Sequence, residues 1–430
     1  MQSNRFTFSA FSKFLFNESR WLLAVTLLLW MLFWSFSGTA ESLRYRLDYT
    51  AKFLPDSRSV QMEIKLGKNA DLVRWIRLRI DPEFHTGFKG RGSIERDGNY
   101  VRWMPDGAGA SLSYNVAINH RRRSGRYDAL FTDDWAVFRG DDLVPPARVR
   151  TAAFAQSRAK LHFEMPKGWS VATPYPKYRN GAFKVDHTER RFDRPTGWMV
   201  AGKIGVKRET IKGIDVAVAG PVGESVRRMD ILALLNWNLP KLVDLIPGFP
   251  SRILLVSAGN PMWRGALSGP DSLYVHADRP LVSENGTSTF IHELMHVAMS
   301  ARGEPGSDWL VEGLAEFYSL ELLSRSGTIT PKRYEKAHKQ LANWGLEAGR
   351  LDVKRAHGAV TAKAVGVLRR VDAEIRRQTG NGASLDNVVR TLVSEGGKIS
   401  LARVRAIAER VTGVPLKALG GEALGLAAKK

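Results

Sequence analysis

The chain of 430 residues contains no cysteine. Disulfide bonds and cysteine-ligated metal sites are therefore excluded, and any metal ion must be held by histidine, aspartate or glutamate. Acidic residues are outnumbered: 43 aspartates and glutamates stand against 64 lysines and arginines, which gives a formal net charge of +21. The basic residues are spread over the whole length, which favours a generally basic, solvated surface. We therefore expect no nucleic-acid partner.

One long apolar run lies near the N-terminus, at residues 21–36, and it contains no charged residue. Arg5, Lys13 and Arg20 precede it, and Gly38-Thr39-Ala40 follows it, which is the layout of a secretory signal. The run falls short of the roughly 20 residues that span a bilayer, so a cleaved signal peptide and an uncleaved signal anchor both stay open. We expect an exported protein, either periplasmic or anchored to the outer face of the inner membrane, with membrane association through residues 21–36.

The first half of the chain after this run shows the alternation of β-strands. Apolar residues occupy every second position in the segments 60–66, 112–118, 161–165 and 214–218, and Gly, Pro, Asp and Asn clusters separate them. Period-two alternation means strands with one buried face, so this half is expected to form a sandwich-type domain or two of them.

The pattern changes near residue 222. The segment Val226–Ile246 is predicted to be mostly helical, with a break at Pro240. Ser251–Ala258 and Ser272–Ala277 are short apolar runs that predict strands, and the periodicity is helical from about residue 331 to the end.

The pattern that decides the function is His292-Glu293-Leu294-Met295-His296. The segment has no helix breaker, and Thr287 and Ser288 precede it as candidate caps. Residues four apart lie on one face of a helix, so both imidazoles can bind one ion, and Glu293 can reach a metal-bound water. The alternative is a chance match on a buried helix.

A second helix is predicted at Trp309–Tyr318, with Ser307-Asp308 as its candidate cap. Catalytic zinc takes three protein ligands and keeps one position open, so the third ligand must be an acid or another histidine. Glu312 is the candidate, because a Gly/Pro turn brings this helix antiparallel to the first. Glu316 is expected to accept a hydrogen bond from His292. The alternative for both glutamates is a solvated helix face, which their apolar neighbours make less favourable.

Together the two helices resemble the gluzincin zinc peptidases and are most similar to the glycyl aminopeptidase family of that clan. The shared pattern is His-Glu-x-x-His followed by Trp-x-x-Glu-Gly-x-x-x-x-Tyr, and the similarity extends through residues 372–390, so that it spans roughly 220–415. The resemblance implies hydrolysis of a peptide or protein substrate at a single zinc ion. The ligands then fall on His292, His296 and Glu312.

Two departures from the family bear on the chemistry. Its Tyr-x-Lys-Gly motif, whose tyrosine helps to hold the oxyanion, aligns here with Thr361–Ala364. His357 is the candidate replacement, with Tyr318 and Tyr334 as alternatives and a plain surface histidine as the other interpretation of His357. Gly265–Gly269 takes the place of a Gly-x-Met-Glu-Asn motif, whose glutamate binds the free amine of a substrate, so the choice between aminopeptidase and endopeptidase stays open.

The expected fold is therefore α+β, with a β-rich N-terminal sandwich-type domain followed by a thermolysin-like, mainly helical zinc peptidase domain. The expected boundaries are 1–40 for the signal peptide or signal anchor, 41–220 for the β-rich domain, 221–345 for the catalytic domain and 346–430 for a helical C-terminal subdomain.

The expected function is hydrolysis of peptide bonds by a Zn²⁺-bound water, with Glu293 as the general base. The substrate is expected to pair in extended form with an edge strand at Ser272–Ala277. The missing tyrosine supports an alternative, a zinc-containing binding or scaffold protein of the same fold with weak or no activity. A third interpretation is a basic surface protein that binds anionic polymer or lipid. The glutamate at position 293 favours the enzyme, because a structural zinc site does not need it.

Overall fold

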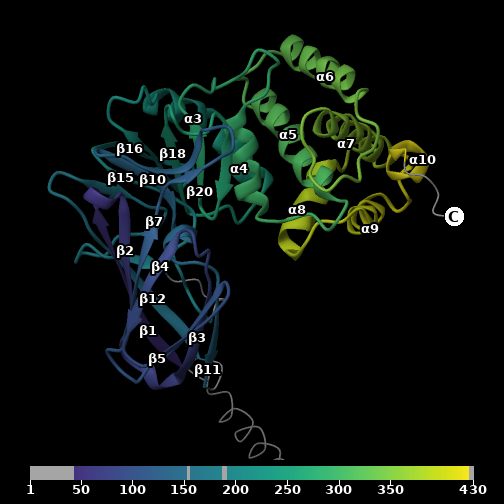
Figure 1. The fold of residues 1–430 in the computed structure, drawn as a ribbon. Coiled ribbons are helices and arrows are strands. Elements are labelled where there is room, and N and C mark those ends of the chain that lie inside the picture. The colour runs from purple at the N-terminus through teal and green to yellow at the C-terminus, as the bar shows by residue number, and fades with distance from the viewer. Residues whose placement is uncertain (1–42, 153–154, 186–190, 426–430) are drawn as a thin grey trace, which may run out of the picture.

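The structure is a computed structural model that describes residues 43–152, 155–185 and 191–425. The predicted signal at residues 1–40 lies outside the described residues. Within the described ranges, no helix is long and apolar enough to cross a membrane. The first half of the chain forms a β-rich part and the second half a mainly helical part beside it (Figure 1), which confirms the predicted α+β order.

Three sheets build the β-rich part. The six-stranded sheet has the order β14 (Phe183–Val185), β12 (Gln156–Glu164), β1 (Arg44–Leu54), β2 (Ser59–Leu66), β7 (Ser111–Ala117) and β4 (His85–Gly90). The four-stranded sheet has the order β11 (Ala147–Thr151), β3 (Val73–Arg79), β6 (Tyr100–Met104) and β5 (Ser93–Asp97). The five-stranded sheet has the order β13 (Ser170–Ala172), β15 (Trp198–Gly202), β10 (Trp135–Arg139), β9 (Tyr127–Phe131) and β8 (His120–Arg121). Short turns occur at η1 (Pro55–Ser57), η2 (Ala70–Leu72) and α2 (Gly140–Leu143).

The predicted alternation explains how these sheets share a core. In β2, every second side chain from Val60 to Leu66 is buried and the others are more exposed. Tyr49 of the six-stranded sheet, Ile76 of the four-stranded sheet and Phe138 of the five-stranded sheet all belong to one apolar cluster. The β-rich part is therefore a packed sandwich, as predicted.

A fourth sheet carries the rest of the molecule. Its order is β16 (Ile204–Ile211), β17 (Ile214–Pro221), β18 (Arg252–Ala258), β20 (Ser272–His276) and β19 (Ala266–Gly269). The chain enters this sheet at residue 204, within the range 41–220 predicted for the β-rich domain, and β17 pairs in parallel with β18. Alternation identifies a strand but does not say which sheet the strand joins.

An apolar layer joins this fourth sheet to the β-rich part. Trp198 of β15 packs with Val256 of β18 and Tyr274 of β20 in one buried cluster. The two parts of the molecule thus meet through buried side chains and not through a solvated linker.

The helix α3 (Arg228–Leu245) covers one face of the fourth sheet and runs through Pro240 without a break. The predicted break is therefore wrong. Proline removes one helical hydrogen bond, and the neighbouring residues compensate by packing: Leu239 and Leu242 are 0% and 1% exposed. The Asn238 side chain also donates to the Leu234 carbonyl at 2.8 Å, which ties the helix together just before the proline.

The remaining helices stack outward from this sheet (Figure 1). They are α4 (Thr289–Met299), α5 (Asp308–Arg325), α6 (Pro331–Gly345), α7 (Ala359–Gln378), α8 (Leu385–Glu395), α9 (Leu401–Thr412) and α10 (Gly421–Leu424), with the turn η3 (Lys417–Leu419) between the last two. The predicted helical periodicity after residue 331 is confirmed. The helix α4 lies between the fourth sheet and α5, and α5 packs in turn against α7.

Candidate metal centre

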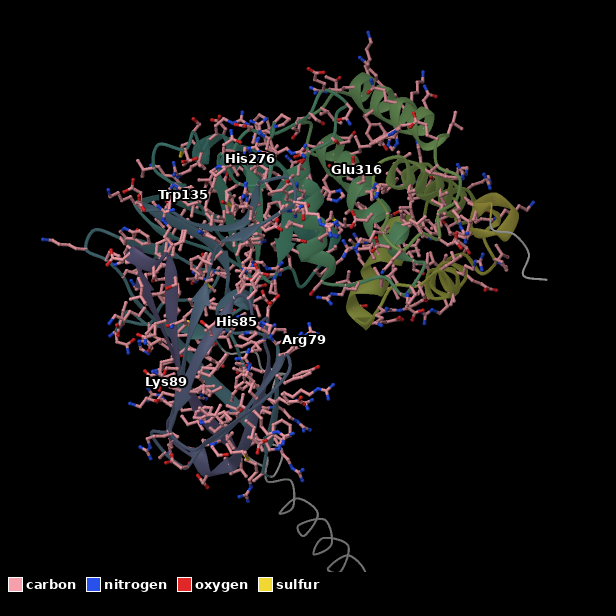
Figure 2. All side chains as sticks on the ribbon, in the orientation of Figure 1. Arg79, His85, Lys89, Trp135, His276 and Glu316 are labelled. Atoms are coloured by element: carbon pink, nitrogen blue, oxygen red, sulfur yellow. The ribbon has the colours of Figure 1, made fainter. Side chains whose placement is uncertain are left out.

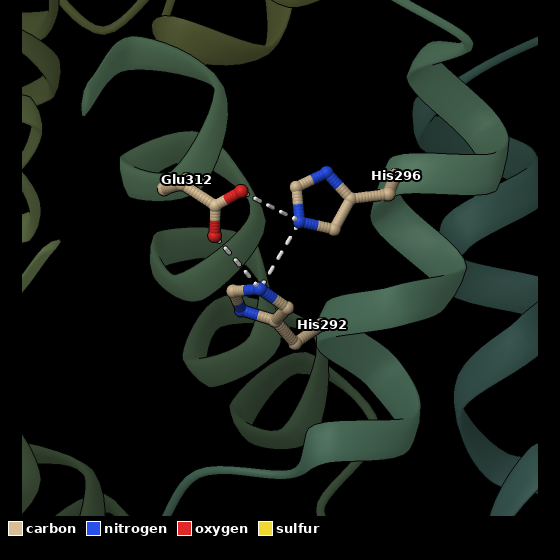
Figure 3. A group of neighbouring side chains, drawn as sticks. All are labelled: His292, His296 and Glu312. Atoms are coloured by element: carbon tan, nitrogen blue, oxygen red, sulfur yellow. Dashed lines mark hydrogen bonds and ion pairs between the residues drawn. The ribbon is translucent and has the colours of Figure 1, made fainter. Parts of the chain in front are cut away.

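Three side chains from two helices meet at one point (Figure 3). His292 and His296 lie one turn apart on α4, and Glu312 reaches them from α5. The His292 Nε2 atom is 3.1 Å from His296 Nε2 and 3.4 Å from Glu312 Oε2, and His296 Nε2 is 3.5 Å from Glu312 Oε1. Ligands about 2.0–2.2 Å from a tetrahedral ion lie about 3.3–3.6 Å from one another. The three groups therefore fit a single small metal ion.

Two contacts hold α4 and α5 in this arrangement. The Ser288 amide, at the start of α4, donates to Ser319 Oγ at 3.1 Å, and the Ser319 hydroxyl donates back to the Ser288 carbonyl at 3.1 Å. Both serines are fully buried. Ser319 was not identified from the sequence, although a serine among the apolar residues of the helix that carries Glu312 was the available indication.

The predicted side-chain caps of these two helices are wrong. Ser288 and Ser307 occupy the N-cap positions, but neither side chain accepts a hydrogen bond from its helix. The Thr287 hydroxyl donates instead to Asn285, and Asp308 accepts from the Ala356 amide at 2.8 Å. These other hydrogen bonds compete with capping for Thr287 and Asp308, while the buried Ser288 hydroxyl has no hydrogen-bond partner among the described residues.

Glu316 lies one turn after Glu312 on α5 and contacts the other nitrogen of His292. The His292 Nδ1–H donates to Glu316 Oε2 at 2.9 Å when Nε2 carries the lone pair. Figure 2 labels Glu316 on the helical side of the molecule. A carboxylate on Nδ1 fixes the tautomer and the orientation of an imidazole so that Nε2 is free to bind a metal ion.

The charges of this cluster are strongly coupled in the metal-free chain. Burial lowers the pKa of His292, but its hydrogen bonds with Glu312 and Glu316 outweigh that effect and raise the pKa to about 10. Burial raises the pKa of Glu312, but its hydrogen bonds with His292 and His296 outweigh that effect and hold the pKa well below the usual range. A proton therefore occupies the place of the ion at neutral pH, and metal binding must release it.

Glu293 lies on α4 directly after the first histidine. It is 8% exposed, and within the described ranges its carboxylate has no hydrogen-bond or ion-pair partner. Its charge is close enough to His292 to raise the pKa of that imidazole. The carboxylate is thus near the centre and uncommitted, as a general base must be.

The three candidate oxyanion donors differ in what surrounds them. Tyr318 is fully buried and its hydroxyl donates to Asp386 at 2.9 Å, while the Tyr334 hydroxyl donates to Glu321. Each of the two tyrosine hydroxyls is therefore already held by a carboxylate. His357 is exposed on the loop before α7, and its ring makes no hydrogen bond or ion pair with the described residues. Nothing in these contacts assigns an oxyanion role to His357, so that role stays a prediction.

The edge strand beside the centre is β19 and not β20, which corrects the prediction for Ser272–Ala277. The strand β20 is paired on both sides, in parallel with β18 and antiparallel with β19. The strand β19 covers Ala266–Gly269, the segment that replaces the amine-binding motif, and it lies next to α4. The chain runs from β18 out to the edge strand β19 and then returns inward to β20, an order that the sequence pattern did not indicate.

No protein-family model and no curated protein matches the chain. Among solved structures, it is similar to an aminopeptidase N family protein from Idiomarina loihiensis, with a TM-score of 0.63 and 15% sequence identity. The match covers 81% of this chain and 70% of that chain. At this identity the likeness concerns the fold. The chain therefore has an aminopeptidase N-like fold, with β-rich sheets followed by a helical region that carries the His-His-Glu centre.

Proposed function

We propose that the chain is a zinc peptidase in which His292, His296 and Glu312 hold the metal ion and Glu293 is the general base. The observation that carries the proposal is the convergence of the three ligand groups, whose ligand atoms all lie within 4.8 Å of one another. The peptidase-like fold supports it independently. The proposal concerns peptide bonds as a class and not a particular sequence.

The donor set is that of a catalytic zinc site. Two imidazoles and one carboxylate supply three ligands, and a fourth position stays open for water or substrate. Imidazole nitrogens suit zinc and its neighbours in the periodic table, whereas calcium and magnesium prefer oxygen ligands throughout. A bound zinc ion lowers the pKa of its water toward about 7 and polarises the carbonyl of the scissile bond.

The protein groups around the ligands then have separate tasks. Glu293 accepts a proton from the attacking water and passes it to the leaving amine. Glu316 holds the His292 ring in orientation through Nδ1. The low exposure of Glu293 keeps bulk water away from the proton that it carries.

The free edge of β19 is the proposed docking strand for the substrate. Among the described residues this strand pairs on one side only, with β20, so its outer backbone groups are available to an extended peptide. Gly265–Gly269 carries no acidic side chain. The segment therefore provides hydrogen bonds to a peptide backbone but no counter-charge for a free amine.

Two glutamate substitutions and one control test the proposal. In Glu312→Ala we expect loss of stoichiometric zinc, because two ligands alone bind weakly. In Glu293→Gln we expect retained zinc and a fall in peptide hydrolysis of about 100- to 10,000-fold. Glu83→Gln changes an exposed glutamate of the β-rich part and should alter neither property.

Hydrolysis is best measured by mass spectrometry of peptide mixtures. Each mixture is tested in two forms, one with free and one with acetylated amino termini. Cleavage only of the free forms identifies an aminopeptidase, and cleavage of both an endopeptidase. Zinc that stays bound in Glu312→Ala contradicts the ligand set. Zinc binding without hydrolysis of any peptide contradicts the enzyme and leaves the zinc-containing binding protein.

A further inference from the structure

The outer face of the four-stranded sheet carries a row of arginines from three neighbouring strands. Arg148 of β11 is paired with Arg77 of β3, and Arg77 is paired with Arg102 of β6. Residues paired across strands point to the same side of a sheet. Three arginine side chains therefore project from the same face of neighbouring strands, where like charges destabilise one another.

Two further arginines extend this row, and two aromatic rings lie among them. Arg79 follows on β3, Arg150 follows on β11, and both are exposed. The Arg77 guanidinium lies 4.8 Å from the centre of the Tyr100 ring, and the Arg102 guanidinium lies 5.6 Å from that of Trp75. We call the five arginines, at positions 77, 79, 102, 148 and 150, the arginine face; Figure 2 labels Arg79 on the β-rich part of the molecule.

The arginine face has too few acids to neutralise it. Arg102 pairs with Glu95 at 3.3 Å, and Asp97 is the other acid on the adjoining strand β5, so five positive charges meet two negative ones. Within the described ranges, none of the other four arginines forms an ion pair. The Arg77 Nε atom is buried and has no hydrogen-bond partner there. A buried donor without a partner is unusual in a protein, and an ordered water or an ion is the ordinary way in which it is satisfied.

A hollow on this face gives room for such an acceptor. It has a volume of about 370 Å³ and is lined by Arg77, Arg79, Tyr100, Pro146, Ala147 and Arg148. Guanidinium groups bind phosphate and carboxylate groups through two parallel hydrogen bonds. The hollow therefore fits a phosphate group better than a neutral ligand.

The path of the chain places this face near the point where the apolar N-terminal run joins the protein. The Gln156 amide donates to the Leu43 carbonyl at 2.8 Å, and the Ala152 amide, directly after β11, donates to the Leu72 carbonyl, directly before β3. Leu43 thus lies near the Val73–Thr151 end of strands β3 and β11, and the hollow lies toward their other end. Seven residue steps separate it from residue 36, and they span at most about 25 Å.

We propose that the arginine face binds the phosphate headgroups of an anionic phospholipid bilayer. Arginines near an anionic membrane surface each strengthen binding, and aromatic rings such as Trp75 and Tyr100 favour the headgroup region. A soluble polyanion is the other partner that the charge admits. The short tether to residues 21–36 favours the bilayer. The inference does not depend on the proposed peptidase activity.

The absence of cysteine makes a direct test simple, because one introduced cysteine gives a single labelling site. Ser93→Cys places a fluorescent label on the exposed end of β5, beside the arginine face. The full chain is mixed with vesicles that carry quenchers on their headgroups, either zwitterionic or with about one third anionic phospholipid. We expect stronger quenching in the anionic vesicles than in the zwitterionic ones, and loss of this difference in about 1 M salt.

Variants of equal charge change make the test specific. Arg77→Gln with Arg148→Gln should lower the ratio of quenched to unquenched label at least about tenfold. Lys336→Gln with Lys339→Gln removes two exposed positive charges from α6 and should leave the ratio unchanged. Equal quenching in zwitterionic vesicles, or no effect of the two arginine substitutions, overturns the proposal. Binding to heparin through these arginines without any quenching by vesicles also overturns it and identifies a polymer partner.

Discussion

Gly313 follows the candidate ligand Glu312 on α5, and the structure predicts that it is required there. A methyl group at this position would meet the Ala364 Cβ of α7 at 2.6 Å and the Leu368 Cδ1 at 3.2 Å. The first of these atoms is fixed to a helix backbone and cannot rotate away. In Gly313→Ala the two helices must therefore separate by nearly 1 Å, since carbon atoms pack about 3.5–4.0 Å apart.

The magnitude follows from two opposing terms. Overpacking of a close helix contact costs up to about 3 kcal/mol, and alanine in place of glycine within a helix returns about 1 kcal/mol. The free energy of unfolding of Gly313→Ala should therefore fall by about 2 kcal/mol. Because Glu312 is the neighbouring residue and metal sites tolerate shifts of only about 0.2 Å, zinc affinity should fall as well.

The matched variant removes the opposing methyl group. Ala364→Gly alone should cost about 2 kcal/mol, from the lost methyl group and the weaker helix propensity. Combined with Gly313→Ala, it should restore stability to within about 1 kcal/mol of the original chain, so the two substitutions are strongly coupled. Urea denaturation of the four proteins, with and without zinc, measures this. Simple additivity of the two losses, or an unchanged stability of Gly313→Ala, would refute the close-contact argument.

Three further outcomes are expected. Glu316→Gln should weaken zinc binding about 10- to 100-fold in a chelator competition, because the His292 ring loses its carboxylate partner, and unchanged affinity would count against that contact. Zinc binding at pH 7 should release close to one proton from His292, because the pKa of this residue is about 10 in the metal-free chain. Calorimetry in buffers of different ionisation heat counts the released protons, and no release would contradict that pKa. Burial and the Arg369 charge lower the pKa of His338 to about 4, so its protonation in the unfolded state should reduce stability as the pH falls from about 6.5 toward 4, by about 2 kcal/mol at pH 5. His338→Leu should remove this extra pH dependence, and an identical acid response would exclude His338 as its source.

The centre was accessible from sequence because its residues have fixed spacings on single helices. His292 and His296 are four apart, as are Glu312 and Glu316, so each pair faces one way whatever surrounds it. How the two helices pack against each other depends on the tertiary structure and not on the local sequence. It was inferred from the turn and from the family pattern, and the structure brings the groups together. The contact between Ser288 and Ser319 that holds the helices is long-range, and no local pattern encodes it.

The features that sequence reasoning got wrong or missed depend on neighbours far along the chain. The continuity of α3 through Pro240 reflects the packing of Leu239 and Leu242, which outweighs the local preference of proline. The edge position of β19 depends on strand order. The arginine face was hidden for the same reason, because Arg77, Arg102 and Arg148 are distant in sequence and become neighbours only through strand pairing.

The pairing of β17 with β18 has a practical consequence for anyone who wishes to produce the half that carries the His-His-Glu centre alone. A fragment that starts at residue 221 would lose β16 and β17 and leave the apolar strand β18 as an unprotected border, open to pairing with other copies. A fragment that starts at residue 203 would keep the sheet whole but uncover Leu254, Val256 and Tyr274, which now pack against Trp198. Both truncations should aggregate, because the β-rich half covers apolar surface that the helical half cannot expose to water.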